Sequence, residues 1–403
     1  MTTLQPAYLR DPYDFDTVLD RLHSDSGKWR RYPEDVLPLW VADMDFPSPP
    51  PILAALHTRV DHGFFGYGME PQELRDLLCT RMAERYSWQI TPDQIVFLPG
   101  LVCGLNVVAR AIGTPGDGVM VNTPVYPPFL SAPINHDRVV NDIPLAVTTR
   151  TDHHGRTALH YSMDFAAMQA GLLNRTRLFI LCNPHNPVGR AYTRPELEEL
   201  SAFCLRNDLI LCSDEIHCDL LMADTQHIPI ASLDSEIAAH TITLMAPSKT
   251  FNIPGLGCSF AIVPDPELRH RIEKAMAGIV PHVNLLGFAA TYAAYAHCDD
   301  WLTRLRNYLT ANRDFLYDYV KTKWPQVELT LPEATYLGWL GFSALGITQP
   351  YQLFLDHAKV ALGDGTGFGP GGAGFVRINY GCPRPLLKEA LARMSNALEQ
   401  ITP

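Results

Sequence analysis

One lysine in this sequence stands where an amine can act as a nucleophile. Lys249 follows the apolar segment 241–245, whereas most of the other six lysines lie in helix-like or charged surroundings. A lysine at the carboxyl end of a buried strand is partly desolvated, which lowers its pKa and makes a neutral, nucleophilic amine accessible. Taken alone, Lys249 is also explained as a strand-end lysine whose ammonium reaches water.

Two further charged residues adjoin or interrupt apolar segments. Asp214 ends the segment 209–213, and Arg377 lies within 375–380. Burying a carboxylate is costly unless it meets a cation or a donor, and a protonated pyridine nitrogen would serve Asp214. A substrate carboxylate would pair with Arg377 through two hydrogen bonds. A helix cap or a salt bridge for Asp214, and an internal salt bridge for Arg377, are the alternatives.

Two loops could supply hydrogen-bond donors. The segment 183–189 contains two Asn-Pro steps and ends in Gly, which forces an irregular turn, and the Asn186 amide there can donate to a phenolate oxygen. The segment 99–104 follows an apolar strand and opens a helix, so its free backbone N–H groups can cradle a phosphate. Each segment by itself is a commonplace turn.

The elements that position these residues alternate between strands and helices. A helix over 194–206 is predicted, with Thr193 as its N-cap. Strand–helix alternation implies a mostly parallel sheet, in which ligands bind beyond the carboxyl ends of the strands. The predicted strands are 94–98, 118–122, 138–143, 177–182, 209–213, 241–245 and 257–263.

The pattern changes after about residue 280. Long helices are predicted over 288–296 and 301–321, strands near 336–342 and 375–380, and a loop over the glycine-rich stretch 363–374. We therefore expect an α/β protein with a large domain over residues 51–285. A smaller α+β domain would be formed by residues 1–50 and 286–403.

The composition of the chain narrows the classes of partner that the protein can bind. The chain has 403 residues, 47% of them hydrophobic, and a net charge of −11, which makes nucleic acid or an anionic membrane a poor partner. No apolar run reaches the roughly 18 residues that a membrane helix needs, and the first residues carry no secretion signal. The nine cysteines are scattered, which favours a reducing cytoplasm. Cys212, His217 and Cys218 match no standard metal spacing, so no metal is expected.

The order of Asn186, Asp214 and Lys249 resembles the fold type I aminotransferase superfamily, which depends on pyridoxal 5′-phosphate (PLP). Three segments are closer to the MalY/PatB group of cystathionine β-lyases, or C–S lyases. They are WVADMDF at 40–46, SDEIH at 213–217 and PSKTFN at 247–252. The resemblance implies a three-layer fold with a mostly parallel seven-stranded sheet.

The resemblance also implies contacts with the cofactor. Lys249 would form a Schiff base with PLP and then shuttle the α-proton of the substrate. Asp214 would keep the pyridine nitrogen protonated. Asn186 would donate to the phenolate oxygen, with His217 nearby in place of a tyrosine common in relatives, and Tyr126 would stack on the ring.

The remaining implied contacts concern phosphate, substrate and a second subunit. The backbone of Val102 and Cys103, with Ser248, would bind the phosphate. Tyr67 would reach the phosphate of the neighbouring subunit, which implies an active homodimer. The implied substrate contacts are Arg377, Asp45, Asn186 and Tyr336.

Departures from the superfamily pattern bear on the substrate. Gly257 stands in place of the arginine that usually binds phosphate, an absence that the MalY/PatB group tends to share. Ala246 replaces a hydroxyl residue, Gly68 a common Thr, and Ala334 a usual Gly. The cofactor assignment stands, but these changes put the shape of the substrate pocket in doubt.

The function that the resemblance implies is β-elimination from an L-cysteine S-conjugate such as cystathionine, which yields a thiol, pyruvate and ammonia. An aminotransferase, or a decarboxylating or eliminating enzyme specialised for a biosynthetic thioether, is the alternative within the same chemistry. A non-catalytic regulatory protein on the same scaffold is the alternative from another class.

Overall fold

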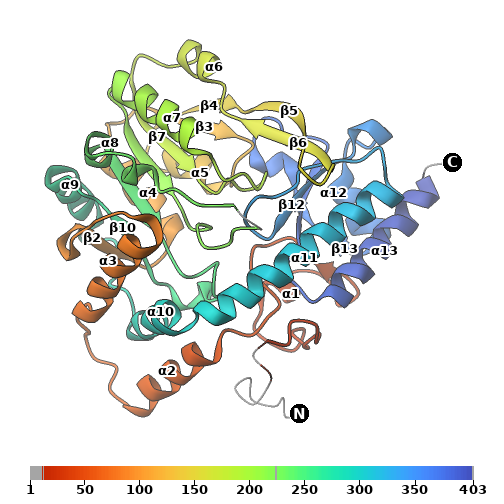
Figure 1. Ribbon diagram of the computed structural model, residues 1–403, viewed down its shortest axis with the longest axis horizontal. Coiled ribbons are helices and arrows are strands. Elements are labelled where there is room, and N and C mark those ends of the chain that lie inside the picture. Colours follow the sequence, from red (N-terminus) through yellow and green to blue (C-terminus); the bar gives the residue numbers. More distant parts are fainter. Residues whose placement is uncertain (1–10, 12, 223–224, 402–403) are drawn as a thin grey trace.

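Seven strands form the central sheet of this computed structural model, which describes residues 11, 13–222 and 225–401 (Figure 1). All seven predicted strands are confirmed, with boundaries that differ by two residues or fewer. The five strands β9, β8, β7, β3 and β4 run parallel, whereas β10 is antiparallel to both of its neighbours. In spatial order the strands are β2 (Ile95–Leu98), β10 (Ser259–Ile262), β9 (Thr241–Met245), β8 (Ile210–Asp214), β7 (Thr176–Cys182), β3 (Gly118–Thr123) and β4 (Val139–Pro144).

Helices cover both faces of this sheet, which makes the expected three layers. Successive residues of a strand point to opposite faces. In β7, Leu178 and Ile180 belong to one apolar cluster, whereas Phe179 and Leu181 belong to another. The first cluster includes α4 (Leu101–Ala111), α5 (Pro128–Ile134) and α9 (Pro266–Met276), and the second includes α6 (Phe165–Ala170), α7 (Arg194–Arg206) and α8 (Ser235–Ala239).

The predicted helix over 194–206 is α7, and Thr193 is its N-cap as expected. The backbone N–H of Thr193 donates to Glu196 at 2.7 Å, which satisfies a group that the helix itself leaves free. A hairpin of β5 (Ala146–Thr151) and β6 (Thr157–Ser162), absent from the prediction, precedes α6.

A second, antiparallel sheet is built largely from the C-terminal part of the chain. Its order is β11 (Glu328–Leu329), β12 (Leu337–Gly341), β15 (Phe375–Asn379) and β14 (Gly363–Asp364). The loop expected over 363–374 was therefore wrong at its start, because residues 363–364 pair with β15 and residues 365–368 form a 3-10 helix. A separate parallel pair joins β1 (Leu37–Pro38) to β13 (Val360–Ala361).

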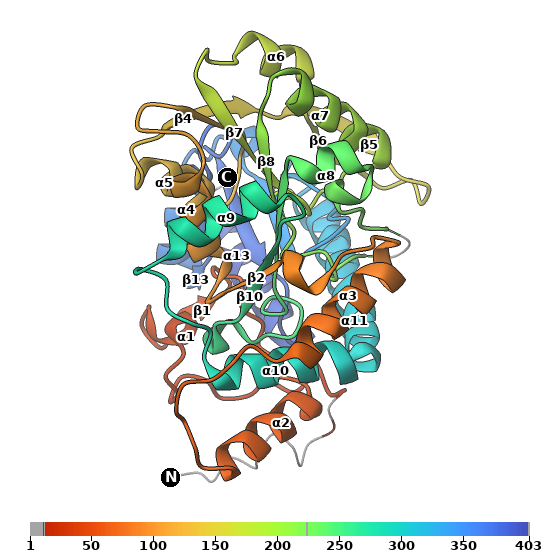
Figure 2. The same cartoon turned by 90° about the vertical axis from the view of Figure 1, so that its left-hand side faces the viewer.

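Long helices flank this second sheet. The predicted helices are found as α10 (Leu285–His297) and α11 (Asp299–Lys323), and α11 lies beside α13 (Arg384–Ile401), where the Tyr319 hydroxyl donates to the Leu391 carbonyl at 3.2 Å. In both views α2 (Pro50–Asp61) lies at the opposite end of the molecule from α6 (Figure 2). The other helices are α1 (Gly27–Arg30), α3 (Gln72–Tyr86) and α12 (Pro350–Leu353).

No helix within the described residues is long and apolar enough to cross a membrane. The domain division at residues 50 and 285 stays a prediction.

Candidate active site

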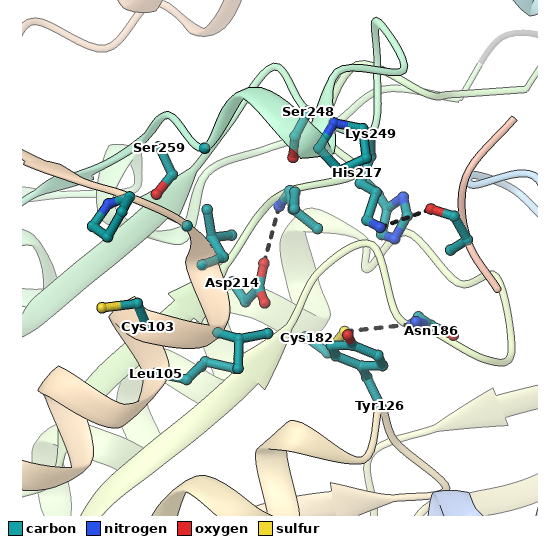
Figure 3. Close-up of a pocket in the computed structure, with 18 of the residues that line it drawn as sticks. Cys103, Leu105, Tyr126, Cys182, Asn186, Asp214, His217, Ser248, Lys249 and Ser259 are labelled. Atoms are coloured by element: carbon teal, nitrogen blue, oxygen red, sulfur yellow. Dashed lines mark hydrogen bonds between the residues drawn. The ribbon is translucent and has the colours of Figure 1, made fainter. Parts of the chain in front are cut away.

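A cavity of about 280 Å³ opens where the carboxyl ends of the parallel strands meet the start of α4 (Figure 3). This is where an open α/β sheet places its ligands. Eight of the predicted site residues line it: Val102, Cys103, Tyr126, Asn186, Asp214, His217, Ser248 and Lys249.

Lys249 lies in the turn that follows β9 and points into the cavity (Figure 3). Its Nζ donates to the backbone carbonyl of Ala42 at 2.7 Å. Burial, and secondarily the positive charge of Arg377, lowers the pKa of Lys249 to about 8, although Asp43 and Asp214 oppose the shift. A lysine with this pKa has a substantial neutral fraction near physiological pH, so it can act as a nucleophile or as a base.

Asp214 is the last residue of β8 and pairs in register with Cys182 of β7. Its Oδ1 accepts from the N–H of Ile216 at 3.1 Å. Burial raises the pKa of Asp214 to about 7, with a smaller contribution from Glu215. Within the described part of the chain no lysine or arginine forms an ion pair with this carboxylate. Asp214 therefore presents a buried carboxylate that a protonated pyridine nitrogen would satisfy.

Arg377 lies in β15 and does not line the cavity itself, but it contacts Asn186, which does. Its two terminal nitrogens donate to the Asn186 side-chain oxygen at 3.0 Å and to the Trp40 carbonyl at 2.8 Å, while its Nε is buried without a partner. Burial lowers the pKa of Arg377 to about 10. A buried guanidinium whose contacts are all neutral is suited to a carboxylate ligand. The hydrogen bond from Arg377 engages the side-chain oxygen of Asn186 and leaves the amide nitrogen of Asn186 to donate elsewhere.

His217 and Tyr126 line the cavity, whereas Tyr336 does not line it but contacts Ala42, which does. Burial lowers the pKa of His217 to about 3, so its imidazole is neutral, and its Nδ1 has no partner. Tyr126 comes from the loop after β3, and burial raises the pKa of its phenol. The Tyr336 hydroxyl donates at 2.9 Å to the same Ala42 carbonyl that Lys249 uses.

The carbonyl groups of the segment 40–46 accept hydrogen bonds from several side chains, which fix the backbone of this segment beside Lys249. In addition to the contacts at Trp40 and Ala42, Asn379 Nδ2 donates to the carbonyls of Val41 and Asp43, both at 2.7 Å. The Asn252 side chain donates to the carbonyls of Met44 and Phe46 and accepts from the Met44 N–H. The position of the Lys249 amine is therefore set by a backbone segment, and the side chains of Asn379 and Asn252 hold that segment in place.

The opposite end of the cavity is suited to a phosphate. Gly100 precedes α4, whose first turn contains Val102 and Cys103, and the N–H groups of a first helical turn have no partner within the helix. Ser248 and Ser259 also line the cavity. Gly257 has a φ of +56°, and a Cβ there would lie 3.1 Å from the Pro99 carbonyl oxygen, so the backbone lies close to this end. A lysine with a lowered pKa, an unpaired buried carboxylate and a helix start in one cavity together fit PLP.

Asp45 and Tyr67 do not line the cavity. The Asp45 carboxylate accepts from Arg21 at 2.6 Å, from Lys28 at 2.7 Å and from the Trp29 indole at 2.8 Å. Both of its oxygens are thus occupied inside the protein, which gives no support to the predicted substrate contact. Tyr67 is fully exposed in the single chain, in keeping with a residue that would act only in another subunit.

Sequence reasoning missed several residues that line the cavity, among them Ala42, Cys182 and Cys258. Ala42 contributes a backbone carbonyl, which leaves no trace in the residue type. The described residues contain no group of three or more His, Cys, Asp or Glu side chains that could hold a metal.

Fold and site together are those of an enzyme that acts on amino acids through PLP. Residues 34–394 match the family described as aminotransferase class I and II, and the chain belongs to this family. PLP is the cofactor of the family.

Relatives define the branch more closely. The chain is 39% identical over 394 residues to the cystathionine beta-lyase PatB of Bacillus subtilis (strain 168), a match that covers 96% of this chain and 100% of PatB. It is 43% identical to OvoB in its crystal structure, with a TM-score of 0.89 and coverage of 96% and 99%. It is 34% identical to cystalysin of Treponema denticola, whose crystal structure contains PLP, with a TM-score of 0.90 and the same coverage.

Proposed function

We propose that this protein is a PLP-dependent carbon–sulfur β-lyase, which cleaves an L-cysteine S-conjugate of the cystathionine type into a thiol, pyruvate and ammonia. The observation that carries the proposal is one cavity lined by a depressed-pKa lysine and an unpaired buried carboxylate, beside an arginine that contacts the cavity-lining Asn186 and has a free N–H. The name of PatB, a cystathionine beta-lyase, supports the same reaction.

Each residue has a task that follows from its surroundings. When bound, PLP supplies an electron sink that makes the α-proton of an amino acid acidic. Asp214 would keep the ring nitrogen protonated, because the positive charge of the protonated ring offsets the cost of burying the Asp214 carboxylate. Arg377 binds the substrate carboxylate and so orients the α-proton. Lys249, whose pKa is about 8, takes up that proton.

Further residues hold the cofactor. The Asn186 amide would donate to the phenolate oxygen, beside the neutral imidazole of His217, and the Tyr126 ring would pack on the cofactor. The α4 start and Ser248 would bind the phosphate. The carbonyl of Ala42 holds the Lys249 amine in a fixed place when the amine is free, since a hydrogen bond of 2.7 Å restricts both its position and its direction.

We propose that the active form is a homodimer. Four large hydrophobic residues gather on the segment 64–69 with exposed fractions of 59% to 108%, namely Phe64, Phe65, Tyr67 and Met69. A contiguous exposed group of this kind favours an interface, and Tyr67 would then enter the neighbouring site. We also place the protein in the cytoplasm, because all nine cysteines are free thiols.

Mixed dimers test the role of Tyr67. Lys249→Ala and Tyr67→Phe chains, mixed by co-expression, form hybrids in which one site receives an intact Lys249 from one chain and an intact Tyr67 from the other. We expect such hybrids to be more active than either variant alone. Hybrids with no more activity than Tyr67→Phe homodimers would contradict the shared site.

A panel of cysteine thioethers tests the reaction. We expect pyruvate and free thiol in equal amounts without any added keto acid, no carbon dioxide, and no product with Lys249→Ala. A keto acid formed only when an acceptor keto acid is supplied would make the protein an aminotransferase, and release of carbon dioxide would make it a decarboxylase.

A further inference from the structure

His185 lies next to Asn186 in the turn after β7, and it is only 2% exposed. Both ring nitrogens have partners from other parts of the fold. Nε2 lies 2.9 Å from the carbonyl oxygen of Pro124, and Nδ1 lies 3.0 Å from the hydroxyl of Tyr192. His185 therefore links the turn after β7 to the loop that contains Pro124 and to Tyr192.

The chemistry of the partners determines the direction of both hydrogen bonds. A carbonyl oxygen only accepts, so Nε2 of His185 must carry the proton and donate to Pro124. Burial lowers the pKa of His185 to about 4, so the ring is neutral and its Nδ1 accepts from Tyr192. Burial also raises the pKa of Tyr192 far above its usual value, which keeps its hydroxyl protonated. The pair thus keeps one arrangement across the physiological pH range.

Both ends of this arrangement lead to residues that face the cavity. Pro124 is two residues before Tyr126 in the same loop, which is also held by a hydrogen bond of 2.9 Å from the Val125 N–H to the Phe368 carbonyl. On the other side His185 precedes Asn186 directly. The Asn186 turn is anchored to the sheet through Asn183, whose N–H donates to the Asp214 carbonyl at 3.0 Å.

We propose that His185, held in one tautomer by Tyr192, is a positioning residue that sets Tyr126 and Asn186 against the cofactor ring. The inference rests on the proposed function for its cofactor but on no particular reaction. It goes beyond that function because neither His185 nor Tyr192 lines the cavity. Their effect reaches the cofactor only through the neighbours they fix.

Two variants and one matched control test this role in the PLP-loaded protein. Tyr192→Phe removes one hydroxyl and leaves Nδ1 of His185 without its donor, and His185→Gln replaces the ring. Tyr319→Phe is the control, since it also removes a hydroxyl that is hydrogen-bonded inside the fold, to Leu391 and Ser395, but between α11 and α13. The readouts are the visible circular dichroism of bound PLP, its dissociation constant, and the thermal midpoint.

We expect Tyr192→Phe to weaken the cofactor's circular dichroism band and to raise its dissociation constant about fivefold, as the loss of one hydrogen bond would. The control should lower the thermal midpoint to a similar extent without changing either cofactor signal. Cofactor signals that stay unchanged in Tyr192→Phe would overturn the proposal, and this variant decides alone where His185→Gln fails to fold. These three measurements need no catalytic turnover, so they test the role of His185 even if the protein shows no lyase activity.

Discussion

The buried ion pair between Asp45 and Lys28 allows the sharpest test of the structure against the sequence. The resemblance implies that Asp45 contacts substrate, whereas the structure occupies its carboxylate with three donors. The Lys28 side chain is fully buried and the Asp45 side chain is 5% exposed. The perturbation is Asp45→Asn, which keeps the shape of the side chain and removes its charge.

The expected magnitude follows from the geometry. At 2.7 Å the attraction between Lys28 and Asp45 is about 6 kcal/mol at an effective dielectric constant of 20. Removal of one partner of a buried pair typically costs about 3–5 kcal/mol, because the other charge stays buried without compensation. Lys28 keeps a second carboxylate, that of Asp43 at 3.5 Å, so we expect Asp45→Asn to lower the free energy of unfolding by about 3 kcal/mol, the lower end of that range.

Urea unfolding of the purified protein, followed by tryptophan fluorescence, measures this loss, and steady-state kinetics on the folded variant measure KM. Arg194→Ala is the control, because its pair with Glu198 spans 3.7 Å between side chains that are more than half exposed. That change should cost less than about 0.5 kcal/mol. The double variant Lys28→Met/Asp45→Asn should lose less than the sum of the two single losses. Wild-type stability of Asp45→Asn together with a raised KM would refute the ion-pair reasoning and return Asp45 to the substrate.

Three further predictions follow from the same contacts. In the cofactor-free protein, acylation of Lys249 should be half-maximal near pH 8, because the fraction of reactive neutral amine increases as pH rises through the pKa of Lys249. Peptide mass spectrometry checks this against exposed lysines, whose pKa is about 10.4. Arg377→Met should raise KM for the amino acid about 100-fold or more, as loss of a bidentate charged contact does. It should lower the thermal midpoint of the cofactor-free protein only modestly, since the two hydrogen bonds that it removes go to neutral groups, the Asn186 side chain and the Trp40 carbonyl. Gly189→Ala should lower the thermal midpoint more than Gly155→Ala does: both have a φ of +76°, which costs about 1–2 kcal/mol, but only at Gly189 would the new Cβ meet Pro332, at 2.6 Å. Equal losses for the two glycines would show that this contact relaxes freely.

The sequence predicted the central sheet well because most of its strands are buried on both faces, the edge strand β4 being the exception. Strands such as 177–182 are almost continuously apolar, a pattern that is typical of strands covered on both faces. The β5–β6 hairpin was missed because residues 147–151 are mostly polar and largely exposed, so they carry no apolar alternation. The two-residue strands β11, β13 and β14 are too short for any pattern.

The candidate site was predictable where it depends on side chains at strand ends. Lys249, Asp214 and Asn186 meet in one cavity because parallel strands end at the same edge of the sheet. The contact between Lys249 and Ala42 joins positions 207 residues apart through a backbone oxygen, and residue types cannot reveal such a contact. The environment of Asp45 was missed for a related reason, since its donors lie outside the resembling segment of 40–46.

The segment 40–46 also has a consequence for how the protein is made. It is synthesised long before several of the side chains that satisfy its carbonyls, since residues 252, 377 and 379 lie 206 to 337 positions further along the chain than the carbonyls they bind. Domains generally fold in order from the N-terminus during synthesis. This cavity is an exception, because its wall near Lys249 is completed only by β15, the last strand among the described residues. A message that stops before β15 would therefore yield a chain with a formed central sheet and no working site.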